Sequence, residues 1–203
     1  MGLRKSFSNS MNRGLTAAND VVNGNFANGT TGWAAIGSTL TALNNVLTVT
    51  GNGTTNVPRT STITGKVCVP GKKVYVKALV KVTDSVCLNV ALRSYGSTVT
   101  GVLQDTPPLI PVMNTVNTIT GILTMPSTST GFVVIAVISS YVDALTANGK
   151  VMEVQEVMAI DLTDLFGAGN EPTKAECDRI FANWFNGTTG LLQTLSPNSP
   201  LRN

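Results

Sequence analysis

KVYVKALVKV, residues 73–82, alternates in character along its whole length. The four valines and the alanine fall on one face, and the three lysines fall on the other with Tyr75 and Leu79. A period of two is typical of a β-strand that has one face in a core and one in solvent. Thr83-Asp84-Ser85 predicts a turn, and residues 86–92 continue the alternation. We therefore expect residues 73–92 to form a β-hairpin.

Short apolar runs separated by Gly, Asn and Pro recur along most of the chain. Residues 130–138 are apolar on both faces, which predicts a central strand or one that is covered on both sides. The proline-rich stretch 106–111 predicts a loop. Weaker strand candidates lie at 45–50, 59–64, 66–69, 98–103, 116–124 and 150–160. The pattern favours an all-β fold, an antiparallel jelly-roll β-sandwich.

The two ends of the chain differ from this β region. Residues 1–19 are polar and basic and lack periodicity, which predicts an extended N-terminal arm that docks on a larger partner. An ordinary loose terminus is the alternative. We expect the sandwich to span 20–162, a closing turn and helix to span 163–190, and an extended tail to span 191–203.

One amphipathic helix is predicted near the C-terminus. Thr173 and Glu176 have the spacing of a capping box, and Asn186-Gly187 is typical of a helix end. An apolar stripe follows at helical spacing: Cys177, Ile180, Phe181, Trp184 and Phe185. We expect the stripe to cover an open edge or end of the sandwich. The alternative is an exposed anchor for a neighbouring subunit.

Composition excludes several function classes. The chain has 203 residues and no histidine, which removes Ser-His-Asp and Cys-His hydrolases and ordinary zinc sites. Its three cysteines form no CxxC pair, and we expect them to be buried thiols. Neither GxGxxG nor a P-loop occurs, so no cofactor is expected. The net charge of +3 and the lack of a membrane-length apolar stretch predict neither a nucleic-acid nor a membrane partner.

An enzymatic function is not expected either. Glycosidases need two facing carboxylates. Glu153 and Glu156 form the only close glutamate pair on a predicted strand. Because they are three residues apart, they point to opposite faces unless a bulge intervenes.

Two stretches resemble known families. VVNGNFANGTTGW, residues 21–33, resembles the opening of carbohydrate-binding-module jelly rolls, in which a first strand leads into a Gly-rich turn. Phe26 and Trp33 are then core anchors on either side of the turn. In that family an acid after the Phe helps to hold a structural calcium ion, and this chain has Ala27 there. The candidates left for calcium oxygens are Asp20 and Asp161.

IDLTDLFGAGNEPT, residues 160–173, together with the helix that follows, resembles a segment of tailed-bacteriophage structural proteins. There it closes a carbohydrate-binding-module-like jelly roll and recurs in tail-fibre, baseplate and head-appendage proteins. The resemblance implies a virion component, made in the cytoplasm of the bacterial host.

The function expected from these resemblances is a non-enzymatic virion structural protein that decorates or attaches to the capsid or tail. Its partners would be other virion proteins (capsid, portal or tail) and further copies of itself, with a trimer as the expected oligomer. The expected contacts lie in the N-terminal arm: Arg4, Lys5, Phe7 and Arg13.

The alternative is a glycan-binding module of a tail fibre or baseplate that contacts the host surface. Exposed aromatic rings stack on sugars, and nearby polar groups bind the hydroxyls. Tyr75, Tyr95 and Arg93 are the candidate residues. Tyr75 and Arg93 would form a four-residue platform with Lys77 and Asn89. An ordinary solvated sheet face is the other interpretation of these residues.

Overall fold

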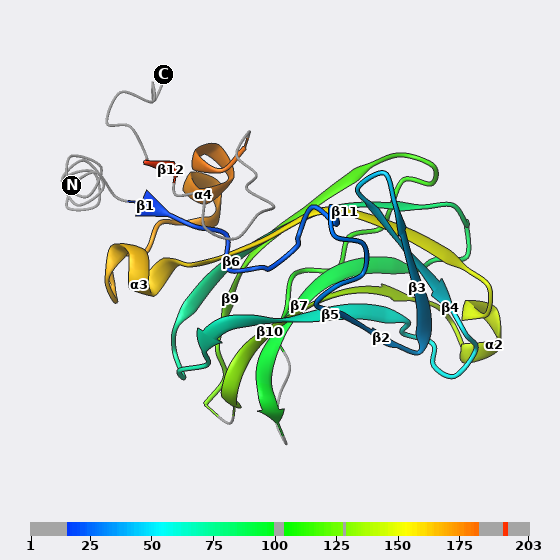
Figure 1. Cartoon of the computed structure of the whole chain (residues 1–203), viewed down its shortest axis with the longest axis horizontal. Helices are drawn as coiled ribbons and strands as arrows, with labels where there is room; N and C mark the ends of the chain where they lie inside the picture. The colour runs from blue at the N-terminus through cyan, green and yellow to red at the C-terminus, as the bar shows by residue number, and fades with distance from the viewer. Residues whose placement is uncertain (1–15, 100–103, 128, 183–192, 195–203) are drawn as a thin grey trace.

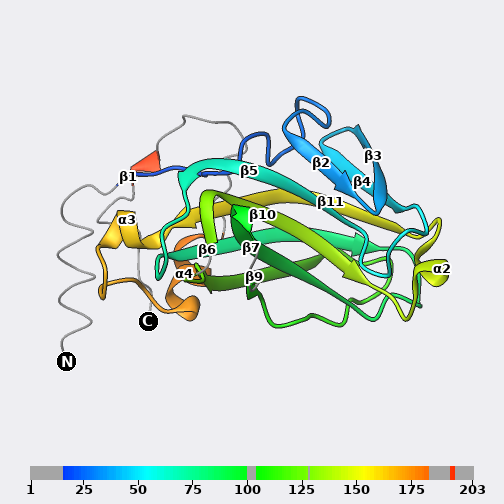
Figure 2. The same ribbon diagram turned by 90° about the horizontal axis from the view of Figure 1, so that it is seen from below.

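The computed structural model describes residues 16–99, 104–127, 129–182 and 193–194. Two five-stranded antiparallel sheets pack face to face in it (Figure 1, Figure 2). The first, called the β10 sheet here, has the order β2 (Trp33–Ile36), β5 (Arg59–Val67), β10 (Ser129–Ser140), β7 (Asn89–Val99) and β8 (Gln104–Asp105). The second, the β6 sheet, has the order β3 (Ser38–Leu43), β4 (Val46–Gly51), β11 (Val151–Asp161), β6 (Lys73–Val82) and β9 (Asn117–Thr124).

This arrangement confirms the antiparallel jelly-roll sandwich. The inner faces of both sheets supply one hydrophobic core, to which Val76 and Val154 contribute from one sheet and Leu92 and Ile135 from the other. β10, which contains the doubly apolar stretch, lies between β5 and β7 as a central strand. A short pair of strands, β1 (Thr16–Ala17) and β12 (Gln193–Thr194), stands apart from the two sheets.

The predicted hairpin of residues 73–92 is wrong. β6 pairs with β11 and β9, whereas β7 pairs with β10 and β8, so residues 83–88 carry the chain from one sheet to the other. Both strands turn their apolar faces toward the same core from opposite sides. Consecutive strands that face each other across a sandwich therefore have the same alternation as a hairpin, and the pattern alone does not separate the two cases.

The chain ahead of β2 lies against β11 without forming the expected first strand. Asn19, which the sequence analysis placed at the end of the arm, is buried; its amide donates to the Val157 carbonyl and accepts from the Ala159 N–H. Val157 N–H donates to the Gly24 carbonyl, and a Cβ on Gly24 would lie 2.1 Å from the Val157 oxygen. β11 bulges here, with Glu156 at φ 50°. Side-chain hydrogen bonds and a bulge thus replace a regular ladder of backbone hydrogen bonds between this segment and β11.

The first turn is confirmed as a junction between two core anchors. The rings of Phe26 and Trp33 are buried with their centroids 5.1 Å apart. Asn23 organises the turn from a left-handed conformation, φ 53°, and its side-chain amide donates to the Gly29 and Thr31 carbonyls at 3.0 Å each. The Trp33 indole donates back to the Asn23 carbonyl at 3.1 Å.

The described residues contain three short helices where one was predicted: α2 (Ala144–Ala147), α3 (Leu162–Phe166) and α4 (Lys174–Ile180). The capping box at Thr173 and Glu176 is confirmed. α4 ends at Ile180 with Phe181 as its C-cap, earlier than expected, and Trp184, Phe185 and Gly187 lie outside the described residues. None of the described helices has the length and apolar character needed to cross a membrane.

A second hydrophobic cluster lies where α3 and α4 meet the outer face of the β6 sheet (Figure 1). Its buried members are Ala17, Tyr75, Met158, Ile160, Leu162, Phe166, Cys177 and Phe181. The described part of the apolar stripe therefore covers one end of the sandwich, as expected. Cys68, Cys87 and Cys177 are buried free thiols, which confirms the prediction for the cysteines.

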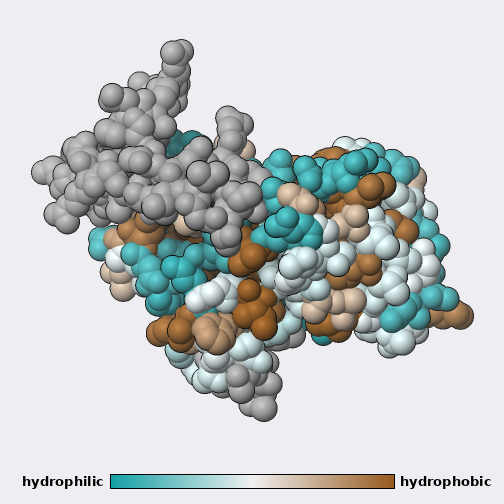
Figure 3. Space-filling view, in the orientation of Figure 1, coloured by the Kyte–Doolittle hydropathy of each residue, from teal (hydrophilic) through white to brown (hydrophobic). Residues whose placement is uncertain are grey.

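The adjoining edges of the two sheets, β2 and β3, carry no charge. The two strands follow each other in the chain and contact each other. No charged residue occurs between Asp20 and Arg59. Figure 3 shows pale residues of intermediate hydropathy over much of this part of the surface. Edge strands in natural proteins usually carry charged residues that prevent pairing with another chain, so this edge is unprotected.

Candidate functional site

Tyr95 and Arg93 lie together on the outer face of the β10 sheet. Val90, Leu92 and Ser94 of the same strand, β7, are fully buried in the sandwich interior. The alternation of a strand therefore points Arg93 and Tyr95 outward, and both are partly exposed. Of the three predicted glycan-binding residues, these two share one surface.

The strand register places side chains of three strands in rows across this outer face. Residues directly opposite each other on neighbouring strands point to the same side of a sheet. Two adjacent rows result: Ile63–Val134–Tyr95 and Ser61–Ala136–Arg93. The central positions of both rows are aliphatic, so the polar groups stand toward the sides.

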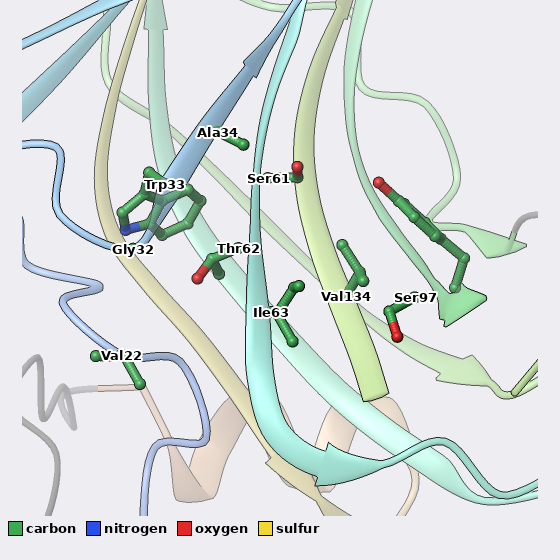
Figure 4. Close-up of a pocket in the computed structure, with 10 residues that line it drawn as sticks. Val22, Gly32, Trp33, Ala34, Ser61, Thr62, Ile63, Ser97 and Val134 are labelled. Atoms are coloured by element: carbon green, nitrogen blue, oxygen red, sulfur yellow. The ribbon is translucent and has the colours of Figure 1, made fainter. Parts of the chain in front are cut away.

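A shallow hollow of about 640 Å³ lies on this face beside Tyr95. Its lining comes from the segment before β2 and from four strands: Val22, Gly32, Trp33, Ala34, Ser61, Thr62, Ile63, Val134, Tyr95 and Ser97. Figure 4 shows Trp33 and Ala34 to one side of β5 and Val134 and Ser97 to the other. A mostly apolar lining with a few hydroxyl groups and one tyrosine suits the apolar face and the hydroxyls of a sugar ring.

Arg93 is held by an ion pair at the side of the sheet. Its Nε and Nη2 donate to the two carboxylate oxygens of Asp105 on β8 at 2.6 and 2.8 Å. These hydrogen bonds raise the pKa of Arg93 further, although burial opposes the effect. The guanidinium is thus oriented by a bidentate contact, and its charge is already matched.

Tyr75 does not lie on an exposed face, and this prediction is wrong. The side chain is 1% exposed, its ring lies 5.3 Å from that of Phe181, and its hydroxyl donates to Asp178 at 3.0 Å. Burial and the neighbouring Asp178 raise the pKa of the phenol. Lys77 is also buried, and its ammonium donates to the Phe181 and Ala182 carbonyls at 3.2 and 2.9 Å.

The predicted four-residue platform therefore does not form. Tyr75 and Lys77 lie on β6, and Asn89 and Arg93 lie on β7 in the opposite sheet. The polar face of residues 73–82 is covered by α4 at Tyr75 and Lys77. Lys77 donates to carbonyls at the end of α4 that would otherwise lack partners.

The residues from β2, β5 and β10 that line the hollow were not predicted as site residues from the sequence. Ile63 and Phe132 are large apolar side chains with 56% and 47% exposure, and both lie on or next to the site. The doubly apolar character of residues 130–138 was the available signal. It was interpreted only as burial, although an apolar outer face is also what a sugar-binding surface requires.

Asp20 and Asp161 come together, but their oxygens have other partners. Asp161 N–H donates to Asp20 Oδ2 at 3.0 Å, and Lys66 Nζ lies 3.6 Å from Asp20 Oδ1. Lys72 Nζ contacts Asp161 Oδ2 at 3.1 Å and Asp164 Oδ1 at 2.6 Å. Burial raises the pKa of Asp20 despite the adjacent Lys66.

These residues do not fit a calcium ion. Two ammonium groups stand against the carboxylates that a cation would need. Over residues 16–99, 104–127 and 129–182, no three acidic, cysteine or histidine side chains are grouped so that they could hold a metal ion.

The bulge in β11 falls at the glutamate pair considered above. The register shifts between Gln155 and Met158, so strict alternation does not hold at Glu156. Glu153 is paired with Lys81 at 3.1 Å. The carboxylate of Glu153 is therefore engaged in an ion pair across the sheet.

The predicted assembly contacts Arg4, Lys5, Phe7 and Arg13 lie outside the described residues. Their role stays a prediction.

No protein-family model matches the chain, and no curated protein resembles it in sequence. Solved structures do resemble it in fold. An arabinose-bound α-L-arabinofuranosidase, MgGH51, superposes with a TM-score of 0.58 at 13% identity, over 80% of this chain and 29% of its own. The CBM22-1–GH10 modules of Clostridium thermocellum endo-1,4-β-D-xylanase 10B, complexed with xylohexaose, give 0.52 at 16% identity, over 84% of this chain and 32% of their own.

The enzymatically active domain of bacteriophage CBA120 tailspike protein 4 gives a TM-score of 0.49 at 16% identity, over 70% of this chain and 21% of its own. The chain thus spans less than a third of the length of each of these proteins. At such identities the first two likenesses establish the fold, a jelly roll of the kind found in carbohydrate-binding modules and in parts of glycoside hydrolase chains.

Proposed function

We propose that this chain is a non-enzymatic structural protein of a tailed-bacteriophage particle that decorates or attaches to the capsid or tail. The supporting observation is the architecture of the segment that resembles phage structural proteins. Thr163 Oγ1 donates to Glu171 at 2.9 Å and accepts from Lys73 N–H at 2.9 Å, and Gly169 N–H donates to Glu171 at 2.9 Å. Polar residues of the segment thus join it to the start of β6, in agreement with a role in closing a jelly roll.

The position of the β1–β12 pair supports attachment from one side. β1 and β12 pair with each other, with Thr16 opposite Thr194. Both lie at the α3–α4 end of the molecule, away from α2 (Figure 1). An arm that docks residues 1–15 on a virion partner would therefore hold the sandwich by this end and leave the opposite end and the hollow accessible.

Self-association is proposed to use the uncharged β2–β3 edge. Strand pairing needs unpaired backbone N–H and C=O groups, which the open side of an edge strand presents. Symmetry would repeat one such contact around the oligomer and strengthen attachment to the particle.

The test measures attachment to particles. Full-length protein and a variant that lacks residues 1–15 are mixed with particles from which the protein has been removed, and the bound fraction is measured after sedimentation. We expect the full-length protein to bind and the truncated variant, if folded by circular dichroism, to lose most binding. Absence of binding by the full-length protein, or hydrolysis of a glycan by it, would contradict the proposal.

Glycan binding on the outer face of the β10 sheet is the second candidate function, favoured by the hollow beside Tyr95. The arabinose-bound arabinofuranosidase and the xylanase complexed with xylohexaose, which share the fold, agree with it. A glycan array should give hits that Tyr95→Ala weakens about tenfold or more, because ring stacking on a sugar depends on the aromatic face. Leu145→Ala, on exposed α2, is the matched control and should bind as the unmodified chain does. Equal losses in both variants would argue against this face.

A further inference from the structure

We infer that the glycan bound on this face is acidic and that Arg59 binds its carboxylate. The inference rests on the glycan-binding function proposed above and deepens it by naming the class of sugar.

Arg59 lies on the same face as the hollow. On β5, Arg59, Ser61 and Ile63 alternate with the buried Thr60 and Thr62, so they point outward together. Arg59 pairs with Ile138 of β10, one row along from the Ser61–Ala136–Arg93 row. It stands about 7 Å from Ser61, the spacing of alternate residues on a strand.

The guanidinium of Arg59 lacks an acidic partner among the described residues. Its Nε is buried and has no hydrogen-bond partner there, and its Nη1 reaches only the Val57 carbonyl, at 3.5 Å. Most other basic side chains among the described residues are paired with carboxylates: Lys66, Lys72, Lys73, Lys81, Arg93, Lys150 and Lys174.

The charge on the β10 sheet leaves Arg59 as its unmatched group. The described strands of this sheet carry Arg59, Lys66 and Arg93 as bases and Asp105 as their acid. Asp105 is paired with Arg93, and Lys66 is paired with Asp20. A buried donor without a partner costs free energy, and that cost is recovered when the guanidinium turns toward an acceptor that a ligand supplies.

A sugar carboxylate meets this requirement. The planar guanidinium presents its N–H groups in a fork that fits the two oxygens of a carboxylate. Ile36 and Ile138 are the cross-strand neighbours of Arg59, and the guanidinium Nε is shielded from water. The charge-assisted hydrogen bond is therefore stronger than it would be in open solvent. A uronic acid that places its ring over the hollow can extend its carboxylate along β5 toward Arg59.

The experiment compares two ligands that differ only in charge. Oligogalacturonate and the same oligosaccharide after chemical reduction of its carboxyl groups are titrated into the full chain by calorimetry. We expect the acidic ligand to bind at least tenfold more tightly than the reduced one and its affinity to fall with added salt. Arg59→Gln should abolish this preference, and Arg59→Lys should restore only part of it because the fork is lost.

Arg179→Gln is the matched control, because Arg179 is exposed on α4 and carries the same charge. It should keep the preference, and thermal unfolding checks that all variants are folded. An acidic preference that survives Arg59→Gln would overturn the inference. If both ligands bind equally well and Tyr95→Ala weakens both, the glycan-binding proposal stands and the acidic specificity is wrong. If neither ligand binds and a glycan array also gives no hits, both are wrong.

Discussion

Single residues hold the irregular parts of this sandwich, and Asn23 is the clearest case. Its left-handed backbone conformation suits Asn better than most residues, and its amide joins three backbone groups of the following turn. This turn positions Phe26 and Trp33 against the core. A side chain that replaces a secondary-structure ladder should contribute more to stability than its exposure alone indicates.

Asn23→Ala should lower the free energy of unfolding by about 3 kcal/mol, because three hydrogen bonds are lost and partners are left unsatisfied. Chemical denaturation followed by Trp fluorescence measures the change. Asn25→Ala is the control: Asn25 accepts one exposed hydrogen bond, from Ala27 N–H, so its loss should cost under about 1 kcal/mol. Similar costs for the two variants would show that Asn23 does not organise the turn.

At the scale of elements, the junction between β11 and α3 ties the closing segment to the sandwich. Asp161 ends β11 and caps α3, accepting from Asp164 N–H at 2.9 Å. Lys72, just before β6, bridges both carboxylates. Its hydrogen bond is the largest factor that holds the pKa of Asp164 below the ordinary value of 3.8. Burial tends to lower the pKa of Lys72, but the bonds to Asp164 and Asp161 outweigh it and raise the value above 10.5.

Lys72→Gln should therefore destabilise the chain by about 2 kcal/mol near neutral pH, between the values typical of exposed and buried ion pairs. A carboxyl whose pKa is lowered by folding adds stability above its unfolded pKa, and this is lost as pH falls through the folded value. The raised pKa of Lys72 adds stability below about 10.5, which is lost as pH rises further.

The difference in unfolding free energy between the unmodified chain and Lys72→Gln should thus be constant from about pH 5 to 9 and shrink below about pH 4. Urea denaturation at each pH measures it. Lys174→Gln, which breaks an exposed i,i+4 pair with Asp178, should cost only about 0.5 kcal/mol. If the difference in unfolding free energy caused by Lys72→Gln does not change in acid, the contact of Lys72 with the two carboxylates is not electrostatic.

At the scale of the whole molecule, the charge-free β2–β3 edge bears on assembly. Thr39 and Thr41 are exposed on β3, and β3 lacks the charged residues that normally discourage edge pairing. The α3–α4 closing segment and the β1–β12 pair lie at a different end of the molecule (Figure 1). Attachment and self-association would then use separate surfaces.

Thr39→Lys combined with Thr41→Lys should convert an oligomer into a monomer, because two charges oppose strand pairing between copies. Analytical ultracentrifugation measures the mass. Thr118→Lys on β9, at the opposite edge of the same sheet, is the control and should leave the mass unchanged. A monomeric unmodified chain, or dissociation caused by Thr118→Lys, would count against the β3 edge.

The sequence by itself determined the local structure of this protein. Alternation in residues 73–82 and the apolar run 130–138 predicted strands, and the spacing of Thr173 and Glu176 predicted a capped helix. These features depend on neighbours within a few residues. Phe26 and Trp33 were identified as anchors from the resemblance of residues 21–33 to the opening of carbohydrate-binding-module jelly rolls. The acidic and aromatic candidates were found by residue type, which does not indicate whether a side chain is covered.

Only the tertiary structure decided which strands share a sheet and which faces stay open. Tyr75 is covered by Asp178 and Phe181, about a hundred residues later in the chain, and no pattern within β6 signals this contact. The hollow likewise joins side chains from β2, β5, β7 and β10, whose register arises from pairing across long loops. Alternation sets which residues of a strand share a face, whereas contacts between distant segments determine what that face meets.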